Sequence, residues 1–450
     1  MKDVFQYIDA HEQAFIHDLQ RLCRQPSVSA QGVGLQECAE LLVAQMQARG
    51  IPAHLEAVSG GPPLVAAEIP GQAPRTLLFY GHYDVQPTDP IDEWRSDPFA
   101  AEVRDGRLYA RGAQDTKGNI MARIAAVDAH LRVRGRLPVT VKFLIEGEEE
   151  VGSPHLAAAL RERPDLARAD ACIWESGSKD HRDILNIYLG VKGICYVELE
   201  ATGARRDLHS SAGAIIPNPA WRLVWALASL KGHHEQVRIH GFYDDVVQPT
   251  PAEVAHLERI AGQRDDEAIR RDLGIPAFVR GVTGVELLRR SLFEPTCTIC
   301  GLSAGYQGPG SKTVLPRRAS AKVDFRLVPN QRAEDVLQKL REHLRREAFG
   351  DIAVKPLSLE DPWKTPFDAP IVEVVAEAAS EVYGHAPVVL PTMAATGPMA
   401  VVCGPFGTPA VGTGVGHWNG NAHSPNENLR LADYIQGIKH MAMIIGRFAG

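Results

Sequence analysis

Apolar positions in the first part of the chain change between helical spacing and short continuous runs. From Phe5 to about Arg49 they recur every three to four residues, which predicts two opening helices. Further helices are predicted after Gly118 and from Ser153. Short apolar runs occur in the same region, at residues 76–80, 139–145 and 171–174. Because strands that are buried on both faces read as such runs, this order predicts an α/β fold with a doubly wound, mostly parallel sheet.

After Gly190 the pattern becomes one of alternation. Apolar and polar residues alternate at 194–201 and at 319–328, which is typical of strands with one buried and one solvent-facing side. Helical spacing returns at 219–231 and at 333–346. This mixture predicts a separate α+β domain.

We predict that the α+β domain is an insertion at residues 191–357. The α/β domain then has two parts, residues 1–190 and residues 358–450. Helices are predicted in the second part near 371–383 and at 428–448. A chain of 450 residues agrees with this division, because single hydrophobic cores stop growing beyond roughly 250–300 residues.

The composition narrows the choice of partners and location. Hydrophobic residues make up 45% of the chain and charged residues 23%, which is typical of a globular protein. The formal net charge is -7, so no nucleic-acid or membrane partner is predicted. No apolar stretch reaches the roughly 18 residues that a membrane span requires. The first residues lack the basic-then-apolar order of a secretory signal, and the seven cysteines are odd in number and scattered. A reducing cytoplasmic location is expected.

Two of the cysteines, Cys297 and Cys300, have the spacing of a redox motif. They lie in an apolar, β-branched run and not at the start of a helix, where a reactive thiolate would be stabilised. We therefore interpret them as buried strand cysteines.

Imidazole and carboxylate side chains stand next to the apolar runs, on loops that contain glycine or proline. In α/β sheets, such loops at the ends of parallel strands line the binding pocket. Hydrolases hold divalent ions with imidazole nitrogen and carboxylate oxygen, leaving a position for water. The candidate ligands are His82, Asp115, Glu149, Glu150, Glu175 and His423. They predict a site for two divalent ions, zinc in the first place, with manganese and cobalt as alternatives.

The residue types also indicate roles within this set. A pair of ions about 3.5–4 Å apart requires a bridging carboxylate, for which we choose Asp115. A second carboxylate is needed to take a proton from the attacking water and pass it on, and Glu149 beside Glu150 would place a base next to a ligand. Asp84 follows His82 by two residues and is predicted to orient its imidazole.

These segments resemble the M20 metallopeptidases, which include dipeptidases, carboxypeptidases and acylases. The resemblance rests on the segments Tyr80-Gly-His-Tyr-Asp84, Arg111-Gly-Ala-Gln-Asp115, Glu146-Gly-Glu-Glu-Glu150 and Asn421-Ala-His-Ser-Pro-Asn-Glu427. It implies one ion held by Asp115, Glu150 and His423. It implies a second ion held by His82, Asp115 and Glu175, with metal-bound hydroxide as nucleophile, Glu149 as base and Asp84 behind His82. His417 competes for the last ligand role, but Trp418 follows it where the family motif has a serine, so His423 is preferred.

The resemblance extends to the inserted domain, which it makes a lid and dimerisation domain. Within Asp207-Leu-His-Ser210, His209 matches the histidine that reaches into the partner's site and stabilises the oxyanion in dimeric members. Thr313 and Arg326 match residues that contact substrate, and an arginine suits a carboxylate because its planar fork donates two hydrogen bonds. A homodimer is therefore expected.

One segment departs from the carnosinase-like relatives. Where they carry Arg-x-Gly-Gly-Ser-Ile-Pro, this chain has Thr392-Met-Ala-Ala-Thr396-Gly-Pro398, so the hydroxyl survives as Thr396 but the arginine and both glycines are absent. Alanine restricts the close approach of a backbone to a ligand. In addition, Glu175 matches the carboxypeptidase and acylase members, whereas the aminodipeptidases have aspartate.

The sequence therefore predicts a two-metal hydrolase that cleaves a peptide or N-acyl amide bond in a small substrate with a free carboxylate. A dipeptidase or carboxypeptidase is the first interpretation, and an N-acyl- or N-carbamoyl-amino-acid amidohydrolase is the alternative. A non-catalytic binding protein on the same fold is the alternative of another class.

Overall fold

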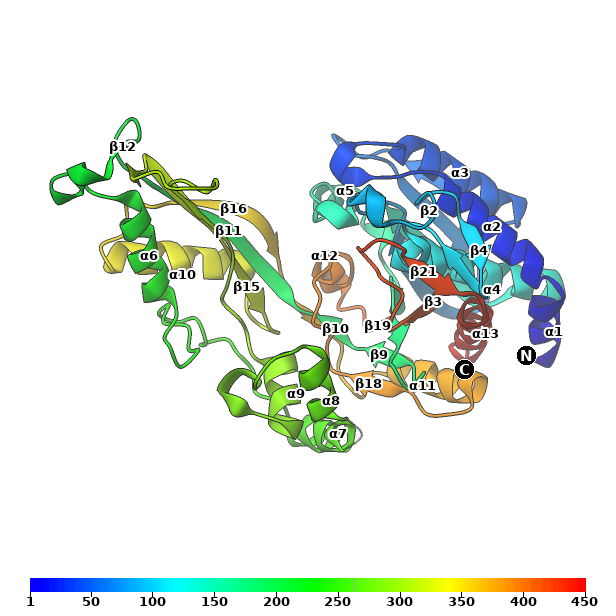
Figure 1. Ribbon diagram of the computed structural model, residues 1–450. Helices are drawn as coiled ribbons and strands as arrows, with labels where there is room; N and C mark the ends of the chain where they lie inside the picture. Colours follow the sequence, from blue (N-terminus) through cyan, green and yellow to red (C-terminus); the bar gives the residue numbers. More distant parts are fainter. Residues whose placement is uncertain (263) are drawn as a thin grey trace. The chain divides into compact units, whose positions relative to one another are not determined.

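The computed structural model describes residues 1–262 and 264–450. These residues form two compact units (Figure 1). Unit 1 contains Met1–Gly190, Lys364–Met393 and Pro398–Gly450, and unit 2 contains Val191–Trp363 and Ala394–Gly397. In the described part of the chain, no helix combines the length and apolar character needed to cross a membrane.

Unit 1 begins with three helices between residues 2 and 48, where two were predicted: α1 (Lys2–Ala10), α2 (Glu12–Arg24) and α3 (Leu35–Ala48). The extra break lies at His11, whose backbone leaves the helical region (φ -115°, ψ 14°). The apolar periodicity continues across this break, because Ile8 and Phe15 pack into the same core. Periodicity alone therefore did not reveal it.

The large sheet of unit 1 has eight strands within the described residues, in the order β1-β2-β6-β3-β7-β19-β9-β18. Its central strands β6, β3, β7 and β19 are parallel to their neighbours in this group. The strands are β1 (His54–Glu56), β2 (Leu64–Ile69), β3 (Gly71–His82), β6 (Leu137–Glu146), β7 (Ala171–Trp174), β9 (Asn186–Tyr188), β18 (Val388–Leu390) and β19 (Ala410–Gly412). Together with the helices, this sheet confirms the predicted α/β fold class.

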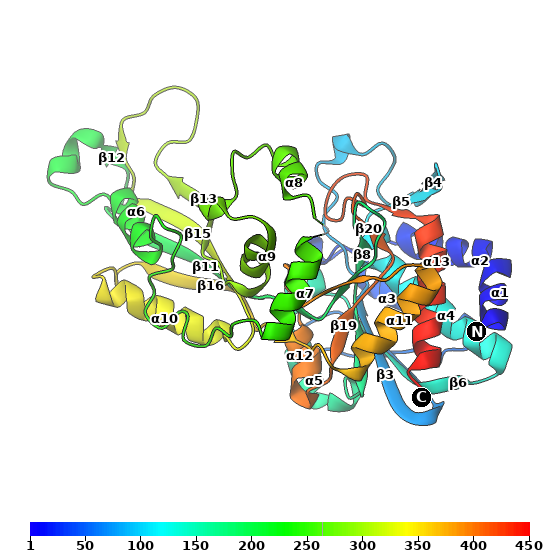
Figure 2. The ribbon, with the colours of Figure 1, turned by 90° about the horizontal axis from the view of Figure 1, so that it is seen from below.

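Both faces of this sheet are buried, as the continuous apolar runs predicted. On β3, Leu77 and Phe79 point to one face and Leu78 and Tyr80 to the other, and none of them is more than 1% exposed. One face packs against the main core, to which α1–α4, α11 and α13 contribute (Figure 2). The remaining helices of unit 1 are α4 (Gly118–Arg134), α5 (Leu156–Glu162), α11 (Pro370–Tyr383), α12 (Met399–Cys403) and α13 (Leu431–Arg447).

The closing helix starts later than predicted. Asn428–Arg430, expected to be helical, forms the short strand β21, which pairs antiparallel with β5. Tertiary pairing therefore overrides the helical spacing at these residues. The other short strands are β4 (Glu102–Arg104), β5 (Arg107–Tyr109), β8 (Ser178–Lys179), β10 (Gly190–Val191), β17 (Trp363–Lys364) and β20 (Gly416–His417).

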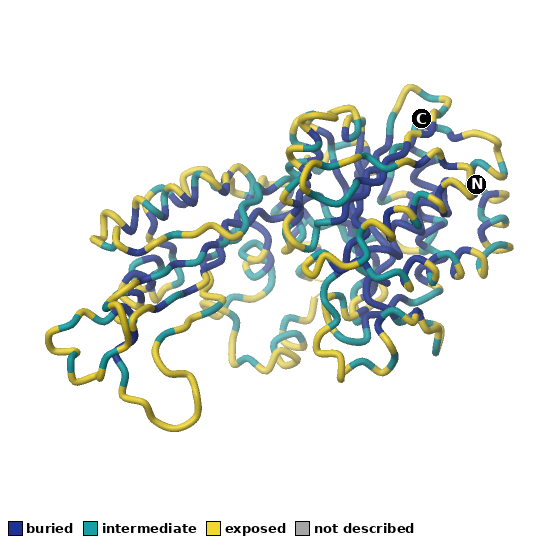
Figure 3. Tube along the Cα trace, turned by 90° about the horizontal axis from the view of Figure 1, so that it is seen from above, coloured by how far each residue is buried: buried dark blue, intermediate teal, exposed yellow. Residues whose placement is uncertain are grey.

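Unit 2 is built on an antiparallel sheet in the order β13-β15-β11-β16. Helices α6 and α10 pack on it and close a second core (Figure 3). Its elements are β11 (Gly193–Thr202), β12 (Leu208–His209), β13 (Thr298–Ala304), β14 (Val314–Leu315), β15 (Arg318–Leu327), β16 (Ala353–Glu360), α6 (Pro219–Leu230), α7 (Pro251–Ala261), α8 (Asp266–Asp272), α9 (Gly284–Phe293) and α10 (Ala333–Arg346). Of the two neighbouring cysteines, Cys297 is buried but Cys300 is exposed on the edge strand β13, so the expectation of two buried cysteines was wrong for Cys300.

A buried arginine on α4 ties two central strands of unit 1 together. Arg123 donates hydrogen bonds to the carbonyl oxygens of Tyr80 on β3, of Trp174 on β7 (2.5 Å) and of Glu175 (2.9 Å). Its side chain is almost fully buried, and burial lowers its pKa to about 10. The guanidinium therefore satisfies carbonyl groups at the ends of two strands that lead into charged loops.

We expect Arg123→Leu to lower the free energy of unfolding in urea by about 3 kcal/mol or more, because it leaves buried carbonyls without donors. The matched control is Arg132→Leu on the same helix. Arg132 is half exposed and contacts Asp128, which keeps its partner Arg49 in the variant. The control should lose less than about 1 kcal/mol. Equal losses for the two variants would contradict this role of Arg123.

Candidate metal centre

The carboxyl ends of the central parallel strands bring charged residues to one edge of the large sheet. His82 is the last residue of β3 and lies opposite Glu146, the last residue of β6. Glu175 directly follows β7, and the turn η4 (Glu149–Val151) follows β6. Because these strands are parallel neighbours, the residues after them meet at the same edge.

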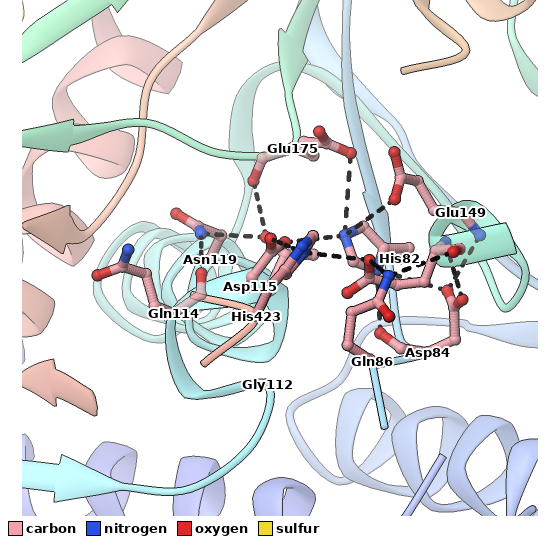
Figure 4. A network of polar contacts seen from close by, with 12 residues as sticks. His82, Asp84, Gln86, Gly112, Gln114, Asp115, Asn119, Glu149, Glu175 and His423 are labelled. Atoms are coloured by element: carbon pink, nitrogen blue, oxygen red, sulfur yellow. Dashed lines mark hydrogen bonds and ion pairs between the residues drawn. The ribbon is translucent and has the colours of Figure 1, made fainter. Parts of the chain in front are cut away.

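Asp115 lies between the two candidate histidines (Figure 4). Its Oδ1 is 3.1 Å from Nε2 of His82, and its Oδ2 is 3.0 Å from Nε2 of His423. Glu150 completes this side of the cluster, with Oε2 at 3.2 Å from Nε2 of His423. One carboxylate thus presents its two oxygens to two different imidazoles.

The other two carboxylates also lie near Nε2 of His82. Glu175 Oε2 is 3.9 Å and Glu149 Oε2 is 4.0 Å from its Nε2. In the described part of the chain, two groups of three side chains are close enough to hold an ion. They are His82, Asp115 and Glu150, and His82, Glu149 and Glu175. Glu149 therefore lies where it can serve either as a ligand or as a base beside one.

The pKa values follow from burial and like charge. Burial, reinforced by the charge of Glu175, raises the pKa of Glu149 well above its ordinary range, and burial raises the pKa of Glu175 to about 7. Burial also acts to raise the pKa of Asp115, but hydrogen bonds to His423 and His82 outweigh it and lower the pKa. The same contact with Asp115, together with Glu150, raises the pKa of His423 to about 10.

This donor set fits a divalent cation. Within the described residues, the buried atoms Oε1 of Glu150 and Oε2 of Glu175 have no hydrogen-bond partner. Buried carboxylate oxygens without partners are costly, and a bound cation removes that cost. Imidazole nitrogen and carboxylate oxygen are also the ligands that zinc, manganese and cobalt accept.

Asp84 supports two parts of the cluster. Nδ1 of His82 lies 3.0 Å from the Asp84 carbonyl oxygen and 3.4 Å from its Oδ1. The carboxylate of Asp84 accepts hydrogen bonds from the backbone N–H groups of Glu149 (3.2 Å) and Glu150 (3.1 Å). The sequence predicted the contact with His82 but not the support of the glutamate turn.

Two further residues of the site were not predicted. Gln86 donates from Nε2 to Oε2 of Glu150 at 2.8 Å, and Glu427 contacts the segment that carries Asp115. Gln86 carried no recognisable signal. Glu427 is the last residue of the segment that was singled out for His423. The role of its carboxylate could be assigned only from its contacts in the folded structure.

The alternative ligand His417 does not belong to the cluster. It lies on β20, is 1% exposed, and has no hydrogen-bond partner for either ring nitrogen among the described residues. Burial lowers its pKa to about 4. His423, in contrast, contacts both Asp115 and Glu150.

The predicted substrate residues of unit 2 form two pairs. Arg326 donates from Nη1 to Oγ1 of Thr396 at 2.6 Å and pairs with Asp324 at 3.0 Å. In the second pair, Oγ1 of Thr313 lies 3.4 Å from Nε2 of His209, and both residues are exposed. Ladder pairing of β12 with β14 holds His209 beside this threonine.

Comparison with known proteins agrees with this site. A family model described as peptidase family M20/M25/M40 matches residues 78–447. The human Beta-Ala-His dipeptidase is 31% identical, covering 98% of this chain and 91% of the relative. A Cys-Gly metallodipeptidase of Schizosaccharomyces pombe is 29% identical, covering 97% of this chain and 96% of the relative.

Solved structures give the same result. An M20 family metallo-carboxypeptidase from Sulfolobus solfataricus superimposes with a TM-score of 0.91 at 39% identity, covering 97% of this chain and 99% of the other. Human carnosine dipeptidase 1 superimposes with a TM-score of 0.81 at 29% identity, covering 100% and 99% of the two chains. The chain therefore belongs to peptidase family M20/M25/M40, and it is a metal-dependent peptide-bond hydrolase.

Proposed function

We propose that this protein hydrolyses the peptide bond of a short peptide with a free carboxylate, using two divalent ions held by its histidine and carboxylate cluster. The observation that carries the proposal is the position of Asp115, whose two oxygens face His82 and His423. A carboxylate in that position suits a bridge between two ions.

The ligand assignment is the one that the M20 likeness implies, and the contacts of Asp115 with His82 and His423 and of Glu150 with His423 support it. Asp115, Glu150 and His423 would hold one ion, and His82, Asp115 and Glu175 the other. Zinc is the first choice, and manganese and cobalt remain alternatives because they accept the same ligands. When bound, such ions polarise the substrate carbonyl and lower the pKa of water.

Glu149 is proposed to move the proton. Its buried carboxylate has a raised pKa, which suits a group that must both accept and release a proton. It would accept a proton from the attacking water and deliver it to the leaving nitrogen. Asp84 holds the backbone of the glutamate turn, so the carboxylate of Glu149 keeps its place beside His82.

The substrate assignment rests on unit 2 and on the relatives. Arg326 is about one-third exposed (34%) and contacts the hydroxyl of Thr396, so these two side chains form a site suited to a substrate carboxylate. The relatives are named as dipeptidases and a carboxypeptidase. An N-acyl- or N-carbamoyl-amino-acid amidohydrolase is the second candidate, because Ala394 and Ala395 replace the two glycines of the carnosinase-like segment.

A homodimer is proposed from the separation of the two pairs in unit 2. Arg326 lies near the end of β15, whereas His209 lies near its start, where Asp207 accepts a hydrogen bond from the Arg317 backbone. Eight residues of strand span roughly 26 Å at about 3.3 Å per residue. One small substrate cannot contact both side chains of the same chain. We therefore propose that His209 serves the site of the partner subunit, where it stabilises the oxyanion.

Unit 2 also offers a surface for such a partner. On α6, Trp221 and Trp225 are 57% and 55% exposed and stack on each other. The edge strand β13 exposes Ile299 and Leu302. Open strand edges and exposed apolar stripes are typical of contacts between subunits. A cytoplasmic location is proposed as well, supported by seven free cysteines.

Hydrolysis of a mixed panel of dipeptides, N-acetyl-amino acids and N-carbamoyl-amino acids tests the reaction. We expect the metal-loaded protein to cleave dipeptides. Glu149→Gln should reduce kcat at least about 100-fold with both ions retained, whereas the neighbouring control Glu148→Gln, which contacts His155, should stay near wild type. Cleavage of only the N-acyl or N-carbamoyl compounds would favour the second candidate. Loss of an ion in Glu149→Gln would make Glu149 a ligand.

Metal content distinguishes the two late histidines. His423→Ala is expected to weaken binding of one ion at least about tenfold, measured by competition with a chelator. His417→Leu should bind metal as the wild type does. Its thermal stability should be unchanged or higher, because two unpaired buried nitrogens are replaced by apolar atoms of similar volume. Loss of metal in His417→Leu alone would reverse the ligand assignment.

Complementation between two inactive variants tests the dimer. His209→Ala and Arg326→Ala should each lose most activity when pure. After they are mixed under exchange conditions, about a quarter of wild-type activity should return, because each mixed dimer contains one site with both residues intact. No recovery, with mixed dimers demonstrated by mass spectrometry, would show that both residues act from the same chain.

A further inference from the structure

Glu427 is a fully buried carboxylate to which the reaction assigns no part. It lies four residues after His423, at the start of the return to β21. Its Oε1 accepts hydrogen bonds from the backbone N–H groups of Gln114 (2.9 Å) and Asp115 (3.0 Å). Its Oε2 accepts hydrogen bonds from the N–H of Gly112 (3.0 Å) and from Nη1 of Arg111 (2.8 Å).

The segment 111–115, which donates these hydrogen bonds, has no regular pattern of backbone hydrogen bonds of its own. Gly112 has a left-handed backbone (φ 84°), and Asp115 is non-helical (φ -121°, ψ 91°) inside the turn η3 (Ala113–Lys117). Backbone N–H groups buried outside regular structure need an acceptor. The single carboxylate of Glu427 supplies it for three of them, so the position of Asp115 depends on a side chain more than 300 residues away in the sequence.

The segment that carries His423 is tied to the same point. His423 and Asn426 both have left-handed backbones (φ 62° and 61°), which persist only where the surroundings hold them. The Ala110 N–H donates to the Glu427 carbonyl oxygen (3.1 Å), and Arg111 reaches the Ser424 carbonyl oxygen (3.4 Å). The Arg111–Glu427 pair therefore links the two segments that present Asp115 and His423 to each other.

We infer that Glu427 is a positioning residue that fixes Asp115 relative to His423 and thereby sets the affinity of this pair for a divalent cation. The inference rests on the proposed metal site and goes beyond it, because Glu427 itself touches no ligand atom. Side chains that hold metal ligands in place typically change metal affinity about 10–100-fold when altered. Glu427 is not interchangeable with glutamine, since an amide NH₂ would face N–H donors on one of its two sides.

The matched control is another buried ion pair of unit 1. Asp433 contacts Lys179 at 2.6 Å, and both side chains are less than one-tenth exposed. Asp433→Asn weakens a buried pair just as Glu427→Gln does, but it leaves the contacts of Asp115 and His423 unchanged. A loss of stability shared by the two variants therefore says nothing about metal binding, whereas a difference in metal affinity does.

The experiment compares four proteins: wild type, Glu427→Gln, Glu427→Asp and Asp433→Asn. For each protein, Zn²⁺ affinity is measured by chelator competition. Deuterium uptake by residues 111–117 is measured in the metal-free protein. We expect Glu427→Gln to weaken binding of one Zn²⁺ at least about tenfold and to speed exchange in 111–117. Asp433→Asn should do neither. Glu427→Asp should lie between wild type and Glu427→Gln, and it keeps the test available if the glutamine variant does not fold.

Wild-type affinity and exchange in a folded Glu427 variant would overturn the inference, and so would equal losses in Asp433→Asn. If wild type itself binds no Zn²⁺, the proposed metal site fails. Exchange at 111–117 then still tests the inference: faster exchange only in the Glu427 variants supports the positioning of the segment, and unchanged exchange overturns it.

Discussion

The organising constraint of this protein is the repulsion among carboxylates that the fold gathers at one edge of its large sheet. Asp115, Glu149, Glu150 and Glu175 gather around His82, which is almost fully buried, and His423, whose side chain is 53% exposed. Burial, together with the charge of neighbouring carboxylates, raises the pKa of both Glu149 and Glu175. A divalent cation bound here would place positive charge among these carboxylates and offset their repulsion.

The scaffold holds this cluster mainly through backbone groups. Asp84 accepts from the N–H groups of the glutamate turn, Glu427 accepts from the segment of Asp115, and Arg123 donates to the carbonyls at the ends of β3 and β7. Each of these side chains is buried, and each hydrogen-bonds to the main chain. The ligand side chains remain available because their supports act on the backbone next to them.

The predicted substrate and oxyanion residues of unit 2 lie at the two ends of one strand. The pair of Arg326 and Thr396 lies near the end of β15, and the pair of His209 and Thr313 lies near its start. Strand length alone keeps them apart. The unit 2 residues that the proposed reaction uses are therefore spread farther apart than one small substrate can reach.

The sequence by itself determined the elements and residue types that depend on local pattern. The continuous apolar runs predicted β6 and β7, and the imidazole and carboxylate residues beside such runs predicted the chemistry of the site, because these signals need no knowledge of distant contacts. Only the tertiary structure decided the break at His11, the pairing of Asn428–Arg430 with β5, the exposure of Cys300 and the burial of His417. It also decided the part played by Glu427. A hydrogen bond from the backbone of Asp115 to a carboxylate 312 residues later leaves no trace in local composition, since it exists only once both segments have folded.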